Sequence, residues 1–189
     1  MKSVDILVGE HGLIHQALDT LSLAKETLEK GQRPPRAFFE KAVEFSKSFS
    51  DRFHHFKEEF LMFGLLSQIK EGRYDGEIAA LKYQHERGRK FIDQIEQSIK
   101  GYADGDLIAT TTLLENLASY ISLLKLHIHS EDHIFFQMVK KALSAEEDHA
   151  LLTQFKNEEK RFGSENFFEK SRELVLEMET SIEQWQQRE

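Results

Sequence analysis

Two segments of this 189-residue chain repeat one pattern, a histidine followed four positions later by a glutamate, inside a long amphipathic run. The first pair is His55 with Glu59, and the second is His127 with Glu131. Residues four apart in an α-helix lie on the same face, one turn apart. Each segment therefore presents an imidazole and a carboxylate in one direction, and the fold has to give both pairs a suitable environment.

Apolar residues recur at helical spacing along nearly the whole chain, which predicts six helices and no strand. We expect them, separated by breaks such as the glycine- and proline-rich segment 31–35, at about residues 4–29, 35–69, 76–102, 106–143, 144–162 and 164–189. Short connections make consecutive helices antiparallel. We therefore predict an all-α fold, with an antiparallel up-down four-helix bundle over residues 1–143 and a C-terminal extension of two helices, residues 144–189, packed on it.

Composition argues against several classes of function. The formal net charge is −8 and no basic patch is concentrated anywhere, which argues against nucleic acid as a partner. No apolar stretch is predicted to span a membrane and residues 1–5 open no apolar signal segment, so we expect a cytoplasmic protein with no membrane partner. The chain has no cysteine, so any metal ligands have to be His, Asp or Glu.

Angular positions at about 100° per residue indicate which histidines face the predicted core. His127 and Glu131 fall inside the apolar stripe of the fourth helix, and His85 falls inside that of the third. His11 borders the stripe of the first helix, and His15 lies further round. Four other histidines are expected at the surface: His54, His129, His133 and His149.

The second helix offers two overlapping pairs with the same spacing, His54 with Glu58 and His55 with Glu59. At the α-helical angle, His55 and Glu59 flank the apolar stripe, whereas His54 and Glu58 point nearly the other way. This angular argument selects His55 and Glu59 as the inward pair.

Burying four imidazoles and two carboxylates in one bundle would be costly unless something compensates them. Metal ions can do so, since imidazole and carboxylate suit divalent iron, manganese or zinc. Two glutamates bridging two metals, with two histidines on each, would give four protein donors per ion. An oxo or hydroxo bridge would add a fifth and leave a position open for O2, NO or peroxide. The competing interpretation is a set of ordinary core histidines and surface pairs with no metal.

Four segments, 10–14, 54–59, 84–89 and 127–132, together resemble the successive motifs of the hemerythrin-like (HHE cation-binding) proteins. The resemblance covers about the first 140 residues, in the expected order. It implies a four-helix bundle that holds a non-haem di-iron centre. Carried over by position, the ligands would be His11, His55, Glu59, His85, His127 and Glu131, with His15, Glu58 and Asp132 as secondary candidates.

The sequence departs from oxygen-carrying hemerythrin at two of these motifs. Leu81 stands where the third helix of hemerythrin supplies a second histidine, and Glu131 fits the apolar stripe better than Asp132, which has the hemerythrin spacing. One histidine fewer and a second glutamate argue against simple reversible oxygen carriage. They match the branch of the family with the ligand order His, His-x-x-x-Glu, His, His-x-x-x-Glu.

We therefore expect a di-iron protein, with two iron ions and an oxo or hydroxo bridge, that binds, senses or reacts with O2, NO or hydrogen peroxide. The sequence does not separate binding from redox turnover of these ligands, because both need the same metal ligands. Iron storage or sensing, and a metal-free helical interaction module, are the alternatives. An apolar stripe from Phe167 to Trp185 predicts that the last helices cover the bundle, with a homodimer through them as the alternative.

Overall fold

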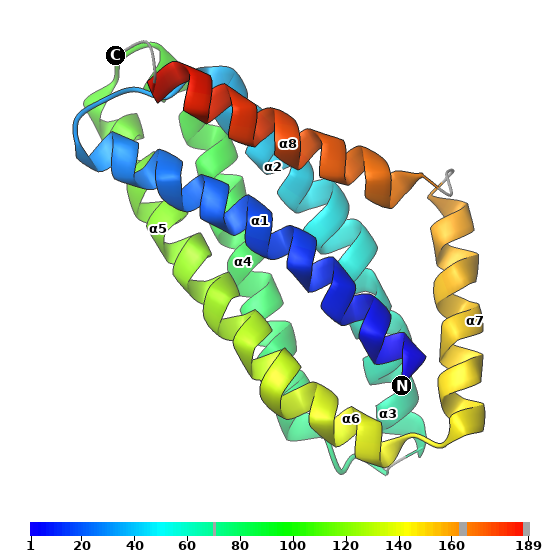
Figure 1. Ribbon diagram of the computed structural model, residues 1–189. Coiled ribbons are helices and arrows are strands. Elements are labelled where there is room, and N and C mark those ends of the chain that lie inside the picture. The colour runs from blue at the N-terminus through cyan, green and yellow to red at the C-terminus, as the bar shows by residue number, and fades with distance from the viewer. Residues whose placement is uncertain (70, 163–165, 187–189) are drawn as a thin grey trace.

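The computed structural model describes residues 1–69, 71–162 and 166–186, and their regular structure is entirely helical (Figure 1). Four long antiparallel helical segments form the bundle, and two more helices follow. The first segment is α1 (Lys2–Glu29); the second joins α2 (Arg36–Phe45), η1 (Ser46–His55), η2 (Lys57–Met62) and α3 (Phe63–Ile69); the third is α4 (Asp75–Ala103); the fourth joins α5 (Leu107–Ser130), η3 (Glu131–Phe135) and α6 (Phe136–Ala142). The extension consists of α7 (Ala145–Arg161) and α8 (Phe167–Gln186). The all-α bundle with two added helices is confirmed.

The turns between helices use the residues that local chemistry favours. Gly31, just after α1, has a φ of 79°, a left-handed conformation that glycine adopts without strain. Asp106 caps α5 by accepting a hydrogen bond from the backbone N–H of Ile108 at 2.8 Å. A capping box begins α7, with Ser144 and Glu147 each bonded to the other's backbone N–H.

Two separate apolar cores fill the bundle, and a layer of polar residues lies between them. One core contains Leu13 of α1 and Ile92 of α4, and the other contains Leu7 of α1 and Leu81 of α4. His11 lies between the two leucines of α1, and His85 lies between the two core residues of α4. The fold therefore places its buried histidines at one level, with apolar packing on both sides to exclude water.

The C-terminal extension packs on the bundle within the same chain. Helix α8 lies along α1 and α2, and its Val175, Met178 and Ile182 are buried in the first core (Figure 1). Helix α7 packs on α1 and η2, and contributes Phe155 to the second core. The apolar stripe of α8 is thus used inside the chain, and a homodimer through these helices stays a prediction.

The fourth helical segment, Leu107–Ala142, is by length and composition alone long and apolar enough to cross a membrane. Its most apolar stretch has a mean hydropathy of 1.3, and 28% of that stretch is buried. This differs from the expectation that no apolar stretch reaches such a length. A helix that supplies a bundle with core residues meets the same criterion, so the observation is weak evidence for a membrane partner.

Candidate metal centre

Five histidines and two glutamates converge in the polar layer between the two cores. They form two groups, and within each group the potential ligand atoms lie within 4.8 Å of one another. The first cluster consists of His55, Glu58, His85 and His127, and the second cluster consists of His11, His54, Glu58 and Glu131. All seven side chains are buried. Because Glu58 belongs to both clusters, the two form one continuous centre.

The carboxylate of Glu58 spans the two clusters with its two oxygens. Oε1 lies 3.4 Å from Nε2 of His54, in the second cluster, and Oε2 lies 3.4 Å from Nε2 of His85, in the first. Glu131 approaches both groups too, since its Oε2 lies 3.3 Å from Nε2 of His11 and 3.1 Å from Nε2 of His127. Two carboxylates in such positions are suited to bridge a pair of cations.

Buried polar atoms without a hydrogen-bond partner concentrate at this centre. Among the described residues there are eight such side-chain atoms, and seven belong to the two clusters. They are Nε2 of His11, Nε2 of His54, Nδ1 of His55, and both carboxylate oxygens of Glu58 and of Glu131. An unsatisfied buried polar atom costs roughly 1–3 kcal/mol, more for a charged group. Metal ions would satisfy these atoms together, so the donor set fits a metal centre.

Outer residues hold four of the histidines by their other ring nitrogen. The Nδ1–H of each donates to a side-chain oxygen: His11 to Asp132 at 2.7 Å, His54 to Glu10 at 2.9 Å, His85 to Glu59 at 2.7 Å and His127 to Gln84 at 2.8 Å. Such outer contacts fix the ring orientation and tautomer of metal-binding histidines. Here they turn these Nε2 atoms toward the interior of the centre, where those of His85 and His127 also lie 3.0 Å from each other.

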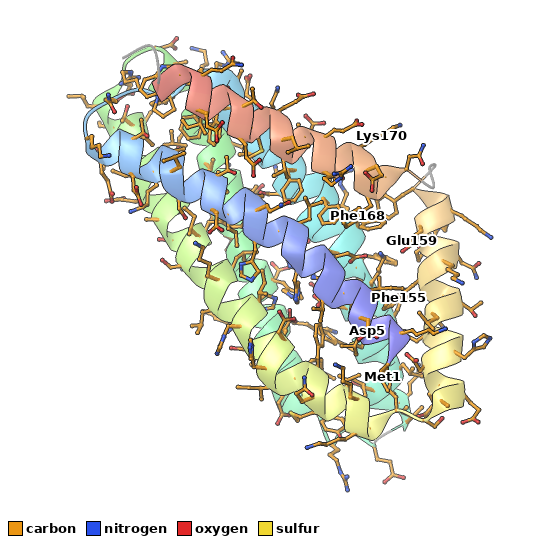
Figure 2. The ribbon with its side chains drawn as sticks, in the orientation of Figure 1. Met1, Asp5, Phe155, Glu159, Phe168 and Lys170 are labelled. Atoms are coloured by element: carbon orange, nitrogen blue, oxygen red, sulfur yellow. The ribbon has the colours of Figure 1, made fainter. Side chains whose placement is uncertain are left out.

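A buried lysine connects the second cluster to the C-terminal extension. Lys57 is fully buried and forms ion pairs with Glu10 of α1 and, at 3.0 Å, with Glu159 of α7. Its ammonium group also lies 3.6 Å from the ring centroid of Phe53. Figure 2 shows Glu159 on the side of α7 that faces the first turns of α1. Since Glu10 also accepts from His54, this contact network runs from α7 to the metal centre.

The charges of the centre separate its histidines into two kinds. Burial disfavours the charged form of His54, but the carboxylates of Glu58 and Glu10 outweigh that effect and raise its pKa to about 10. Burial, together with neighbouring histidines, holds the pKa of His85 well below its ordinary value of 6.5, and burial also lowers the pKa of His55. His55 and His85 of the first cluster therefore favour the neutral imidazole, the form that binds metal.

The structure changes which residues of the two overlapping pairs face the interior. His54 is 1% exposed and Glu58 is fully buried, so the expectations that His54 lies at the surface and that both residues point away from the core were wrong. Glu59 lies outside both clusters, where its carboxylate accepts from Arg89 at 2.6 Å and from His85. Its position is that of an outer residue that orients a histidine. His55 does lie in the first cluster, as expected.

The helix type explains why these side chains face directions other than those predicted. Residues Ser46–His55 and Lys57–Met62 are π-helical, with hydrogen bonds five residues apart. A wider turn holds more residues, so the angle per residue is smaller than the α-helical value used in the prediction. Side chains within and after these turns are therefore rotated relative to an ideal α-helix. Both His54 and His55 are thereby brought to the interior.

The structure also shows where the remaining candidate residues lie. His11, His85, His127 and Glu131 all lie in the clusters, and His129 and His133 are exposed, as expected. Of the secondary candidates, Glu58 is central, Asp132 is an outer partner of His11, and the half-buried His15 belongs to neither cluster. The fifth histidine, His54, was missed. Its signal was the doubling of both residue types in 54–59, where each histidine has its own glutamate four positions later.

The sequence of this chain is similar to a known family and to proteins from two mycobacterial species. The family described as "Hemerythrin HHE cation binding domain" matches residues 2–139. "Uncharacterized protein Rv1995" of Mycobacterium tuberculosis and "Uncharacterized protein Mb2018" of Mycobacterium bovis are each 26% identical over 176 residues, covering 93% of this chain and 68% of the relative. No solved structure matches the chain. The matched residues include both clusters, and the family predicted from the motifs is confirmed.

Proposed function

We propose, on the premise that this chain belongs to the hemerythrin HHE cation-binding family, that it is a non-haem di-iron protein. It would bind, sense or react with a small ligand such as O2, NO or hydrogen peroxide. The observation that carries the proposal is the pair of clusters sharing Glu58, with seven unpartnered polar atoms buried between them. One metal ion could not use this donor set, whereas two ions bridged by carboxylates could.

The donor set also divides unequally between the two proposed ions. The first cluster offers three imidazoles and the second offers two, with Glu58 common to both. His11 and His54 would hold the second ion together with Glu131. Bound iron would supply the redox and ligand-binding chemistry. The chain's part is to orient the imidazoles through their Nδ1 partners and to exclude water with the two apolar cores.

Iron with histidine and carboxylate donors suits reactions with oxygen-containing ligands, and the cores would keep reactive species away from solvent. Whether the ligand is bound, sensed or turned over depends on the open positions at the ions, and the same residues serve all three outcomes. An oxo or hydroxo bridge between the ions belongs to the proposal. So does a cytoplasmic location.

The proposal is tested by metal analysis and absorption spectroscopy of protein produced in iron-replete medium. We expect about two irons per chain and near-ultraviolet bands of an oxo-bridged di-iron unit, which change on addition of O2, NO or hydrogen peroxide. A stoichiometry near one, or zinc alone, would contradict the di-iron proposal. Two irons with no spectral response to any of the three ligands would favour iron storage, and no metal at all would favour a helical interaction module.

A further inference from the structure

A cavity of about 280 Å³ lies between η1 and α4, beside the first cluster. Its buried lining consists of Ser46, Ser50, His55, Gly88, Ile92 and Tyr120. His55 belongs both to this lining and to the first cluster, so the cavity borders the metal centre directly. The side chains of that centre are buried, so a ligand needs a route to reach them.

Charged residues surround the outer end of the cavity, and they pair with one another across the two helices. Arg89 of α4 donates to Asp51 of η1 at 2.7 Å, and Lys47 of η1 pairs with Asp93 of α4 at 2.9 Å. Each of these ion pairs places a basic group beside an acidic group at the mouth of the cavity. Arg52 also lines the opening and donates to the backbone carbonyl of Lys47, so three basic and two acidic side chains there largely offset one another. The mouth therefore does not concentrate one sign of charge, and it suits an uncharged molecule.

The buried part of the cavity is lined with hydroxyl groups. Ser50 is 2% exposed, and its Oγ has no well-formed hydrogen bond, although it lies close enough to the Tyr120 hydroxyl to affect the pKa of that group. Burial raises the pKa of Tyr120 to about 12, against the opposing effect of the Ser46 and Ser50 hydroxyls, so Tyr120 keeps its proton at neutral pH. A buried hydroxyl without a good hydrogen bond is unfavourable, because it has lost its hydrogen bonds to water. A molecule that forms hydrogen bonds would relieve this cost, whereas an apolar molecule would not.

The volume limits the occupant further. Pockets for drug-sized ligands measure about 300–1,000 Å³, and a water molecule in the liquid occupies about 30 Å³. At about 280 Å³ the cavity lies just below that range, so it admits a molecule of a few atoms and is smaller than a typical pocket for a drug-sized ligand. Gly88 helps to keep the space open, since a Cβ there would already lie 3.5 Å from Cδ2 of Leu124 and 3.8 Å from Cε2 of Tyr120.

We propose that this cavity is the passage by which the ligand reaches the metal centre, and that the ligand is a small uncharged molecule that forms hydrogen bonds, of the class of hydrogen peroxide. The hydroxyls of Ser50 and Tyr120 are its contacts on the way to His55. This inference rests on the proposed function, because it assumes a metal centre with a reactive ligand position.

The test measures, by stopped-flow absorption, how fast the iron-loaded protein reacts with hydrogen peroxide and with NO. Ser50→Leu fills the cavity, and Ser50→Ala removes the hydroxyl but keeps the space. Ser48→Leu is the matched control, because Ser48 lies in the same π-helical segment but outside the cavity lining. Iron content and the absorption spectrum before mixing are measured first for every variant.

We expect Ser50→Leu to slow the reaction with peroxide by about tenfold or more with its iron content unchanged, since an obstructed route lowers the rate of association. Ser50→Ala should slow peroxide several-fold while leaving NO unaffected, and Ser48→Leu should match the wild type. A wild-type rate for Ser50→Leu with both ligands would overturn the passage. Slowing of NO and peroxide alike by Ser50→Ala would overturn the assignment of ligand class.

A second variant keeps the test decisive if Ser50→Leu loses iron. Gly88→Val fills the same cavity from the opposite helix, and a wild-type rate for that variant would equally overturn the passage. The failure of this inference is distinct from that of the proposed function. A wild-type protein without iron contradicts the function itself, whereas a di-iron protein whose cavity variants react normally contradicts the passage alone.

Discussion

Replacing Lys57 with methionine tests whether the contact network between α7 and the metal centre stabilises the fold. Methionine has a similar length and is apolar, so the change removes the charge while keeping most of the packing. Without the ammonium group, the buried carboxylate of Glu10 loses its lysine partner and keeps only the contact with His54. Removing one partner of a buried ion pair costs about 3–5 kcal/mol, because the other charge is left uncompensated.

For a chain of this length, each kcal/mol lowers the melting temperature by about 2–4 °C. Lys57→Met should therefore lower it by roughly 6–20 °C, measured by circular dichroism and confirmed by urea unfolding of the metal-free protein. Lys41→Met is the matched control. Lys41 pairs with Glu177 at 2.7 Å, but the two side chains are 35% and 60% exposed. Losing such a surface pair should cost no more than about 1 kcal/mol.

A second substitution separates the charge from the packing. In Lys57→Met/Glu10→Gln, the neutral amide removes the uncompensated charge and its oxygen still accepts from Nδ1 of His54. This double variant should recover part of the lost stability. The reasoning is refuted if Lys57→Met unfolds within about 1 kcal/mol of the wild type, as the surface control is expected to do, or if the double variant is no more stable than Lys57→Met.

Three further predictions concern metal and protons. Chelation should lower the melting temperature, since a ligand at 100 times its Kd stabilises the folded state by about 2.7 kcal/mol; an unchanged melting curve would argue against a metal that binds the folded state. His129→Ala and His133→Ala should bind metal and melt as the wild type does, because both side chains are exposed; loss of metal from either would place a ligand outside the two clusters. The metal-free protein should be most stable near pH 6.5. Below that pH, His55 and His85, whose folded pKa values are lowered, resist protons that the unfolded chain accepts, so stability falls. Above it, the stability from protonated His54 is lost progressively as pH rises toward its folded pKa of about 10. Urea unfolding between pH 5 and 9 measures this, and a free energy of unfolding that rises steadily across the range would contradict it.

The sequence predicted those parts of the centre that lie on regular α-helices. His11 on α1 and His85 on α4 were found from the apolar stripes, since an α-helix repeats its geometry at every turn. His127 on α5 and Glu131, which follows it directly, were found in the same way, because the widened turns of that segment begin only at Glu131. Helix order and the capping of α7 were equally accessible, because both depend on local residue types.

The second helical segment was predicted less well, because nothing in its composition indicates a π-helix. At the α-helical angle, the apolar stripe of this segment would include Phe60, but its side chain is 65% exposed. The same error turned Glu58 outward and Glu59 inward. The outer partners were also beyond prediction, since Glu10 and Lys57 meet only when α1, η2 and α7 pack together.

The comparison of Glu58→Ala with Glu59→Ala tests the central claim most directly, with iron content measured per folded chain. Glu58 supplies an oxygen to each cluster, whereas Glu59 only orients His85 from outside. We predict that Glu58→Ala loses at least half of the bound iron. Glu59→Ala should keep two irons at saturation, with affinity weakened by about 10–100-fold. Iron retained in full by Glu58→Ala and lost from Glu59→Ala would contradict the shared carboxylate, and with it the two-cluster centre.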